Sequence, residues 1–341
     1  MARRKARIPQ GKKIQPAVKT ILLNAPAGSA HTVDLSQCAS LLNRRFYRQG
    51  LNWAVAGFTF ITAASTTGTI SVAKVPDTWV ASNSWEKGFR HWLKMNNDAM
   101  DGIESIKPKF MDFKVYMDNV HHQAGVASNL TPLMGSPATA LSLGTWDMSE
   151  VTFPTSGATG NAADFEIIWT GASYPGVAAT STLDAVSLIE GYASSRGLPE
   201  IRDPNAPADA SDVGPTATPE NWIGALENEG TEQDQDVLVN LLADNNQAPY
   251  PYENDGTHTD TQYPGGANQP AGAGSKLELH DVVGISATTI GNTTRMNGGN
   301  FQGGLVRIDM TDLSDTSNVA IIVHLVPGPH LGYMCQSMQD V

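Results

Sequence analysis

The sequence predicts an all-β protein, a β-sandwich with short helical insertions and long loops. Only 16% of its 341 residues are charged, whereas it contains 32 glycines and 20 prolines. Few charges and many turn formers favour a sandwich over a helical bundle. Alternating apolar runs follow one another with few helices between them, which is typical of a sandwich and not of a regular alternation of strands and helices.

The first expected element is a strand at residues 18–25, which is followed by a short helix at residues 35–47. Residues 51–62 (LNWAVAGFTFIT) and 68–75 (GTISVAKV) alternate apolar with small or polar side chains, as strands do. A threonine-rich turn joins these two segments, so we expect them to pair with each other. Pro76 then ends the second strand.

An aromatic helix is expected directly after that strand. Trp85, Phe89 and Trp92 recur at i, i+4 and i+7, which places them on one face of an α-helix. Asn83 and Glu86 have the spacing of a capping box and are expected to begin the helix. An aromatic face of this size has to be covered, so we expect it to pack against the sandwich.

The rest of the chain adds further strands and one more helix. TLDAVSLIEGYASSRG, residues 182–197, is the best helical pattern after the aromatic helix, with Gly197 at its end. Apolar alternation predicts strands at residues 107–120 (with a bulge), 145–153, 163–171, 275–290, 303–310 and 317–327.

Residues 198–274 differ in composition from everything around them. Between Glu200 and Asp260 there are fourteen acids and a single base, Arg202, among many Pro, Asn, Gly and Thr residues. We expect a long, acidic, loop-rich and solvent-exposed insertion with one helical piece near residues 234–242. The remaining chain, residues 20–341, is then one domain that carries this insertion.

Residues 1–19 form a basic arm, which we expect to be disordered because it has few large apolar residues. The arm contains no acid, and beyond it 15 basic residues face 34 acids, a balance of −19. Such asymmetry indicates an anionic partner for the arm, and nucleic-acid phosphate suits it. A solubilising tail or a nuclear-import signal would have a similar composition. The expected nucleic-acid-binding residues are Arg3, Arg4, Lys5, Arg7, Lys12, Lys13 and Lys19.

Signatures of catalysis are missing from the sequence: GxSxG, HExxH, GxGxxG, a Walker-type loop and CxxC do not occur. We therefore expect no enzymatic activity and no cofactor. His121 and His122 are expected in an exposed turn, and Asp164 and Glu166 on the solvated face of a strand. The acidic insertion offers weak candidates for a structural calcium ion, namely Asp234, Asp236, Glu253, Asp255 and Asp260.

Cys38 and Cys335 are the only two cysteines, and reduced, buried thiols are favoured over a bridge between them. We expect no membrane partner, because the sequence has no run of about eighteen apolar residues and no secretory signal.

The basic arm, the strands after it and the aromatic helix resemble the capsid proteins of small circular, Rep-encoding single-stranded DNA viruses. The likeness is carried by a K-x-P-x-T-W turn that runs into W-x-K-x-F, here Lys74, Pro76, Thr78, Trp79, Trp85, Lys87 and Phe89. It implies a single jelly roll that assembles with copies of itself into an icosahedral shell around single-stranded DNA, with residues 1–19 facing the genome. It also implies a location in the virion, and in the host nucleus or cytoplasm during assembly. This chain is less basic than that family usually is, so polyamines or metal ions are expected to help neutralise the genome.

Three other interpretations stay open. The arm reads phosphate and not sugar, so the coat of a small RNA virus would have the same features. A carbohydrate-binding or adhesin module on a β-sandwich would expose Trp79, Trp85 and Trp92 as coplanar rings. A hydrolase would bring Asp164 and Glu166 together in a cleft.

Overall fold

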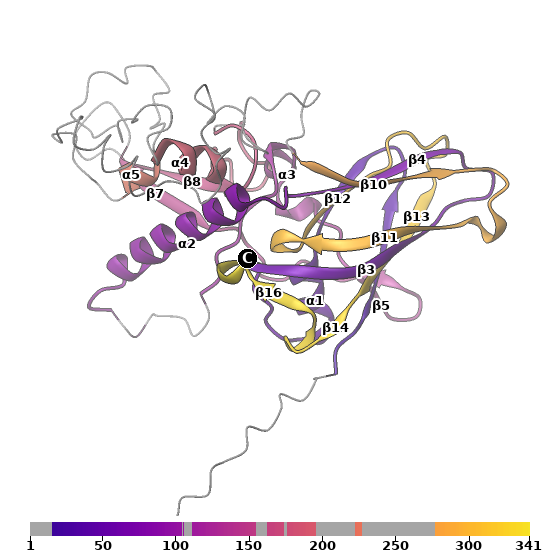
Figure 1. Cartoon of the computed structure of the whole chain (residues 1–341), viewed down its shortest axis with the longest axis horizontal. Coiled ribbons are helices and arrows are strands. Elements are labelled where there is room, and N and C mark those ends of the chain that lie inside the picture. The colour runs from indigo at the N-terminus through magenta and orange to yellow at the C-terminus, as the bar shows by residue number, and fades with distance from the viewer. Residues whose placement is uncertain are drawn as a thin grey trace, which may run out of the picture.

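The computed structural model describes residues 16–103, 105, 111–154, 162–173, 176–195, 222–226 and 277–341. Within these residues the chain is mostly β-structure in largely antiparallel sheets, with fewer helices, as the sequence predicts. Two of the sheets enclose one apolar core and form a sandwich, and a separate group of helices and strands lies beside it (Figure 1).

The first sheet of the sandwich has five antiparallel strands. Its order is β1 (Thr20–Pro26), β13 (Asn318–Leu325), β3 (Leu51–Ile61) and β11 (Thr293–Phe301), and β16 (Cys335–Ser337) pairs with the start of β3. The second sheet has the order β10 (Glu278–Ile285), β4 (Gly68–Lys74), β12 (Leu305–Asp309) and β2 (Ala30–Asp34).

The strand order alternates between the two sheets along the chain. With β16 left aside, the first sheet holds strands 1, 8, 3 and 6 of the sandwich, and the second holds strands 5, 4, 7 and 2. The expected pairing of residues 51–62 with 68–75 is therefore wrong, because β3 and β4 lie in different sheets. Among these eight sandwich strands, β4 and β10 are the one pair that is consecutive along the chain and also adjacent in a sheet, and residues 75–277 are inserted between them.

Aromatic side chains fill the sandwich core. On β3, Trp53, Phe58 and Phe60 are fully or almost fully buried, and Phe301 packs edge-on against Phe58 with ring centroids 5.6 Å apart. The helix α1 (Leu35–Asn43) closes one end of this core. It begins at the N-cap Asp34, whose carboxylate accepts hydrogen bonds from two backbone amides of the first turn.

The inserted residues build a second core, which the sequence analysis did not foresee. It contains a three-stranded sheet of β7 (Glu150–Pro154), β8 (Ala162–Ile168) and β9 (Ala185–Ser187), with the helices α2 (Trp79–Ala99), α4 (Leu188–Ser195) and α5 (Trp222–Leu226). Trp85 and Trp92 of α2 lie in this core, where they pack around Phe113 with ring centroids 5.7 and 5.5 Å from it. The aromatic face is thus covered, but mainly by the insertion and not by the sandwich.

Short elements complete the described part of the chain. They are α3 (Asn119–Ala124), β5 (Leu133–Met134), β6 (Thr139–Ala140), β14 (Pro327–Gly328), β15 (Gly332–Tyr333) and the 3-10 turns η2 (Val126–Ser128), η4 (Ile290–Asn292), η5 (Gln302–Gly304) and η6 (Met338–Asp340). None of the described helices is both long enough and apolar enough to cross a bilayer.

Several sequence-based boundaries were wrong. The helix α2 begins at Trp79 with Thr78 as its N-cap, one turn before the expected capping box. Residues 111–117 are extended but form only an isolated bridge from Tyr116 to Ile168, and the expected strand at 107–120 ends in α3. Residues 185–187 pair in parallel with β8 and so delay the start of the next helix. The helix expected at 35–47 ends at Asn43.

The acidic segment is attached to the second core at one described point. Trp222 of α5 is fully buried, and its Nε1 donates a hydrogen bond of 2.9 Å to the Ser187 carbonyl. Gly191 of α4 faces this ring so closely that a Cβ there would lie 2.0 Å from the indole nitrogen. The expectation of a wholly exposed insertion at 198–274 is therefore wrong for residues 222–226, and its other residues lie outside the described ones.

Candidate nucleic-acid interface

The basic arm joins the folded part of the chain beside the loop that follows α1. The backbone amide of Val18 donates to Asn43 Oδ1 at 2.9 Å, and Tyr333 donates its hydroxyl proton to the Val18 carbonyl at 2.5 Å. Arg45 Nη1 donates to the Pro16 carbonyl at 3.0 Å. Residues 16–19 are thus held against this loop before the chain enters β1.

Three arginines crowd this loop, which we call the arginine loop (residues 44–48). Arg44, Arg45 and Arg48 are all exposed, and Arg44 ends α1 in a left-handed conformation with φ of 52°. Between them lie two aromatic residues, of which Tyr47 is buried and Phe46 is half-buried. Sequence reasoning assigned part of this stretch to a helix and overlooked its R-R-F-Y-R pattern, in which cations flank two aromatic residues. Nucleic-acid-binding surfaces combine positive charge with aromatic rings in a similar way.

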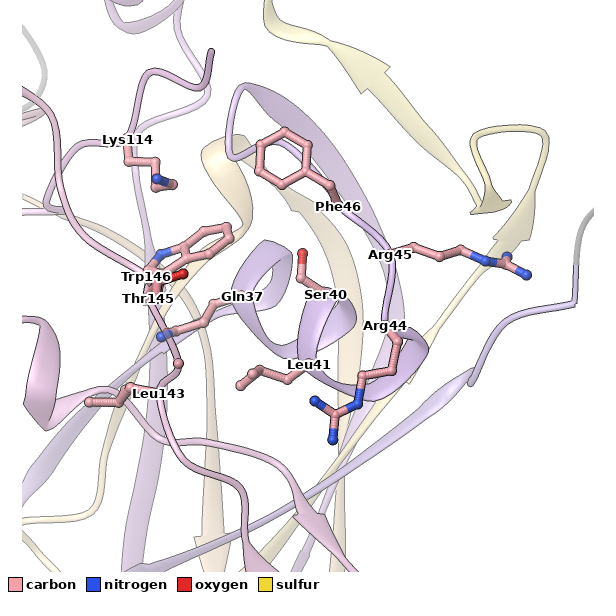
Figure 2. A pocket seen from close by; sticks show the side chains of 11 residues that line it. Gln37, Ser40, Leu41, Arg44, Arg45, Phe46, Lys114, Leu143, Thr145 and Trp146 are labelled. Carbon is pink, nitrogen blue, oxygen red and sulfur yellow. The ribbon is translucent and has the colours of Figure 1, made fainter. Parts of the chain in front are cut away.

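A pocket of about 350 Å³ lies between α1, the arginine loop and residues 143–146, and we call it the arginine-loop pocket (Figure 2). Its lining includes three cations, Arg44, Arg45 and Lys114, and two aromatic rings, Phe46 and Trp146, and none of the residues that line it is acidic. In Figure 2, Lys114 and Trp146 lie on one side, and Arg44 lies on the other side beyond α1. Arg45 extends away from them, toward Pro16.

Backbone contacts hold Lys114 and Trp146 in place. The Lys114 amide donates to Ser149 Oγ at 3.0 Å, and the Ser149 amide donates to the Lys114 carbonyl at 2.9 Å, which fixes the two segments side by side. The Lys114 ammonium lies 4.9 Å from the centre of the Trp146 ring and donates to the Asp147 carbonyl at 3.1 Å. This is a cation–π pair at the pocket wall.

Two buried acids near the arginine loop hold their protons more strongly than usual. Burial raises the pKa of Asp112 to about 7, and it raises the pKa of Asp34 to about 6. Asp112 accepts a hydrogen bond from the Gln49 amide at 3.4 Å, one residue beyond the arginine loop. Near neutral pH Asp112 is only partly ionised, so it compensates less of the positive charge nearby than an ordinary carboxylate would, whereas Asp34 is mostly ionised.

Most of the expected arm residues lie outside the described residues, namely Arg3, Arg4, Lys5, Arg7, Lys12 and Lys13. Lys19 is described and exposed, and its carbonyl accepts a hydrogen bond from the Leu325 amide at 2.8 Å. The calcium candidates Asp234, Asp236, Glu253, Asp255 and Asp260 also lie outside the described residues. Within the described ranges, no group of three His, Cys, Asp or Glu residues has a metal-binding arrangement.

His121 and His122 are buried in α3, so the expected exposed turn is wrong. His121 Nδ1 accepts from the Met117 amide at 3.1 Å, which leaves the ring proton on Nε2 to donate to Asn129 Oδ1 at 2.7 Å. Burial lowers the pKa of His121 to about 3, and nearby Arg307 contributes in the same direction. This histidine is therefore a neutral part of the buried network.

The two carboxylates of the hydrolase interpretation are not brought together in a cleft. Asp164 is exposed and accepts a hydrogen bond from the Thr152 hydroxyl, whereas Glu166 is 2% exposed, so its expected place on a solvated face is wrong. Glu166 accepts from the Tyr116 hydroxyl at 3.1 Å, and its other oxygen lies 2.9 Å from His122 Nε2 without the alignment of a hydrogen bond. This arrangement links α3 to β8 inside the protein.

Two of the three tryptophans of α2, Trp85 and Trp92, do not form an exposed binding platform, and the side chain of Trp79 lies outside the described ones. Trp85 and Trp92 are 4% and 8% exposed, as a structural role requires and a sugar-binding platform does not. Cys38 and Cys335 are both free thiols, and Cys38 is buried. Comparisons with family models, with curated proteins and with solved structures give no match for this chain. Its function is therefore inferred from its own residues.

Proposed function

We propose that this chain is a viral coat protein that assembles with copies of itself into an icosahedral shell and packages single-stranded nucleic acid without catalysis. One observation carries the proposal: the basic arm meets the fold at the arginine loop, next to the pocket with Arg44, Arg45 and Lys114. Half of the 22 Lys and Arg residues of this acidic protein belong to the arm, the arginine loop and the pocket. A polyanion can be held there without contact with the acidic remainder of the chain.

The proposal includes a jelly-roll fold. The sandwich order of strands 1, 8, 3 and 6 against 5, 4, 7 and 2 supports it, because each connection crosses between the sheets except the one that carries the insertion. Eight-stranded jelly rolls in two sheets occur in viral capsid proteins, and also in lectin domains and cupins. The fold alone therefore does not decide the function, and the basic arm and loop supply the rest of the argument.

Exposed apolar side chains support contacts between copies. Leu279 and Val282 on the edge strand β10 are 60% and 46% exposed, and Ile290 in the following turn is 95% exposed. An unpaired edge strand with apolar side chains favours association with another chain. Association that hides these side chains would stabilise a shell.

In this proposal the nucleic acid is single-stranded DNA. The coat of a small RNA virus is the alternative, because Lys and Arg bind the phosphates of DNA and RNA alike. The experiment is electron microscopy of the purified full chain, with digestion of any enclosed nucleic acid by DNase or RNase after the particles are opened. We expect closed shells of uniform size that protect a single-stranded nucleic acid. A chain that stays monomeric at high concentration, at both low and high salt, would refute the proposal.

A further inference from the structure

We infer that the arginine-loop pocket receives an unpaired base of single-stranded nucleic acid, so that the folded part of the protein prefers single strands to duplexes. The inference deepens the proposed function and rests on it for the nature of the partner. DNA and RNA share the chemistry concerned, a flat base attached to a chain of phosphates.

The size and the lining of the pocket suit one base. Its volume of about 350 Å³ is at the lower end of the range of about 300–1,000 Å³ found for small-ligand sites. Phe46 and Trp146 offer aromatic surface, and every base has a face that can stack on such a ring, whatever its sequence. The pocket therefore fits a ligand that is aromatic and variable in sequence.

A base can compete with the cation now on the Trp146 ring. A cation–π contact at an exposed site contributes about 0.5–1 kcal/mol, whereas the stacking of one base on an aromatic side chain contributes about 1–3 kcal/mol. The Lys114 ammonium can move off the ring and keep its hydrogen bond to the Asp147 carbonyl. It then stands at the edge of the pocket, where it can pair with a phosphate.

The arginines supply the other half of the recognition. Arg44 lines the pocket, and its exposed guanidinium is available to a phosphate that flanks the bound base. Arg45 also lines the pocket but reaches to Pro16, near the end of the basic arm that joins the fold. A strand held by the arm is thereby led to the pocket, and the arm raises the local concentration of bases there.

A duplex gains much less from this pocket. Its bases are paired and stacked, and the extrusion of one base costs a few kcal/mol, about as much as the pocket returns. The arm alone binds a duplex readily, because the phosphates of a duplex are more closely spaced than those of a single strand. Preference for single strands must therefore come from the pocket.

The test measures the binding of the full chain to four labelled ligands of about 12 nucleotides: oligothymidylate, oligouridylate, an abasic strand and a hairpin duplex, all at one salt concentration. Trp146→Ala should weaken oligothymidylate binding about tenfold and leave the abasic strand and the duplex within about twofold. Trp146→Phe keeps an aromatic face and should stay close to wild type. Arg44→Gln should weaken all four ligands more than Arg295→Gln, a matched loss of one exposed arginine on β11.

An equal loss for the abasic strand, or no loss for oligothymidylate, would overturn the inference. If Trp146→Ala does not fold, Trp146→Leu, which keeps apolar bulk and every cation but removes the aromatic face, must remove the same discrimination between oligothymidylate and the abasic strand. A difference between oligothymidylate and oligouridylate comes from the sugar or from the methyl group of thymine, and oligodeoxyuridylate, which changes only the methyl group relative to oligothymidylate, separates the two. If the wild-type chain forms shells but Trp146→Ala still distinguishes oligothymidylate from the abasic strand, the pocket inference is wrong and the coat proposal stands. If Trp146→Ala loses this discrimination but the wild-type chain never assembles, the coat proposal is wrong and the pocket inference stands.

Discussion

Arg307 Nη2 donates a hydrogen bond of 2.6 Å to Asp118 Oδ1, and both side chains are almost completely buried. Arg307 belongs to β12 of the sandwich, whereas Asp118 is the N-cap of α3 in the inserted residues, and its Oδ1 also accepts from the His121 amide. One ion pair thus ties the insertion to the sandwich. A buried pair of this kind is costly to break, because the remaining charge is left without compensation.

Arg307→Met should therefore destabilise the protein by about 3–5 kcal/mol, since it leaves the Asp118 carboxylate buried and unpaired. Urea unfolding, followed by fluorescence, measures this loss. Arg295→Met on the exposed face of β11 is the control and should change the free energy of unfolding by no more than about 0.5 kcal/mol. Equal effects of the two changes would show that the buried pair has no special role.

The first sheet of the sandwich shows how much of the fold could be predicted from the sequence. The alternation in residues 51–62 and 317–327 predicted strands, and the inward side chains of β3 and β13, Phe58 and Phe60 among them, are buried. β11 was missed, because TTRMNGGNF contains two glycines and no regular alternation. Its strand conformation depends on pairing with β3, to which Gly298 lies so close that a Cβ would be 2.0 Å from the Val55 carbonyl oxygen.

The candidate site was predictable only in part. The arm and its charge follow from the sequence, and so does the R-R-F-Y-R pattern, although it was overlooked. Lys114 and Trp146 could not be assigned to the same site, because they come from segments that are joined through Ser149 and lie about 70 and 100 residues beyond the arginine loop. The sequence also could not show to which sheet β4 belongs. The connection between β3 and β4 could have been a hairpin turn within one sheet or a crossing between two sheets, and both can have the same composition.

The pH dependence of stability should reveal Asp112. Its folded pKa of about 7 exceeds the ordinary 3.8, so between these values the folded state holds a proton that the unfolded state has released. Stability from this group therefore falls as the pH rises from about 4 to 7. Asp112→Asn lacks this loss, so the stability of the variant relative to wild type should rise over that window, by on the order of a few kcal/mol. A constant difference from pH 4 to pH 7 would contradict the raised pKa.

Trp92→Ala should destabilise the second core. The ring is 8% exposed and packs against Phe113 and Phe89, and the removal of a buried aromatic side chain costs about 3–5 kcal/mol. Thermal unfolding compares this variant with Asp98→Ala, an exposed change on the same helix, α2. If Trp92→Ala melts like wild type but no longer binds a glycan, the carbohydrate-binding interpretation replaces the structural one.

The basic arm should make binding steeply dependent on salt. Seven cations predict a log–log slope of up to about −5 on single strands if all of them engage phosphates. A deletion of residues 2–15 removes six of the cations and keeps residues 16–19, which are bonded to the fold, so the slope should become shallower by about 4 and the unfolding curve should not change. Truncated and full-length chains that bind oligothymidylate equally at every salt concentration would disprove this role of the arm.

The acidic segment, residues 198–274, should lie on the side of a shell that faces away from the genome. Fourteen acids against one base between Glu200 and Asp260 would be repelled by packaged phosphates, and their burial without partners would be very costly. The position of α5, which belongs to this segment, agrees with that orientation. α5 packs in the second core, and in Figure 1 it lies well apart from α1, the helix that the arginine loop follows.

Limited proteolysis of intact particles tests this orientation. A protease that cuts beside acidic residues should cleave within residues 198–274 first, and trypsin should spare the seven basic sites of the arm until the shells are opened. This order of cleavage is expected because the charges set the orientation of the two segments. A basic interior holds the polyanion, and an acidic exterior keeps shells apart in solution by like-charge repulsion. Opened shells treated in the same way are the control, because there the arm must become the first segment that trypsin removes. If trypsin cuts the arm in intact particles while the acidic segment stays protected, the arm points outward and the proposed topology is reversed.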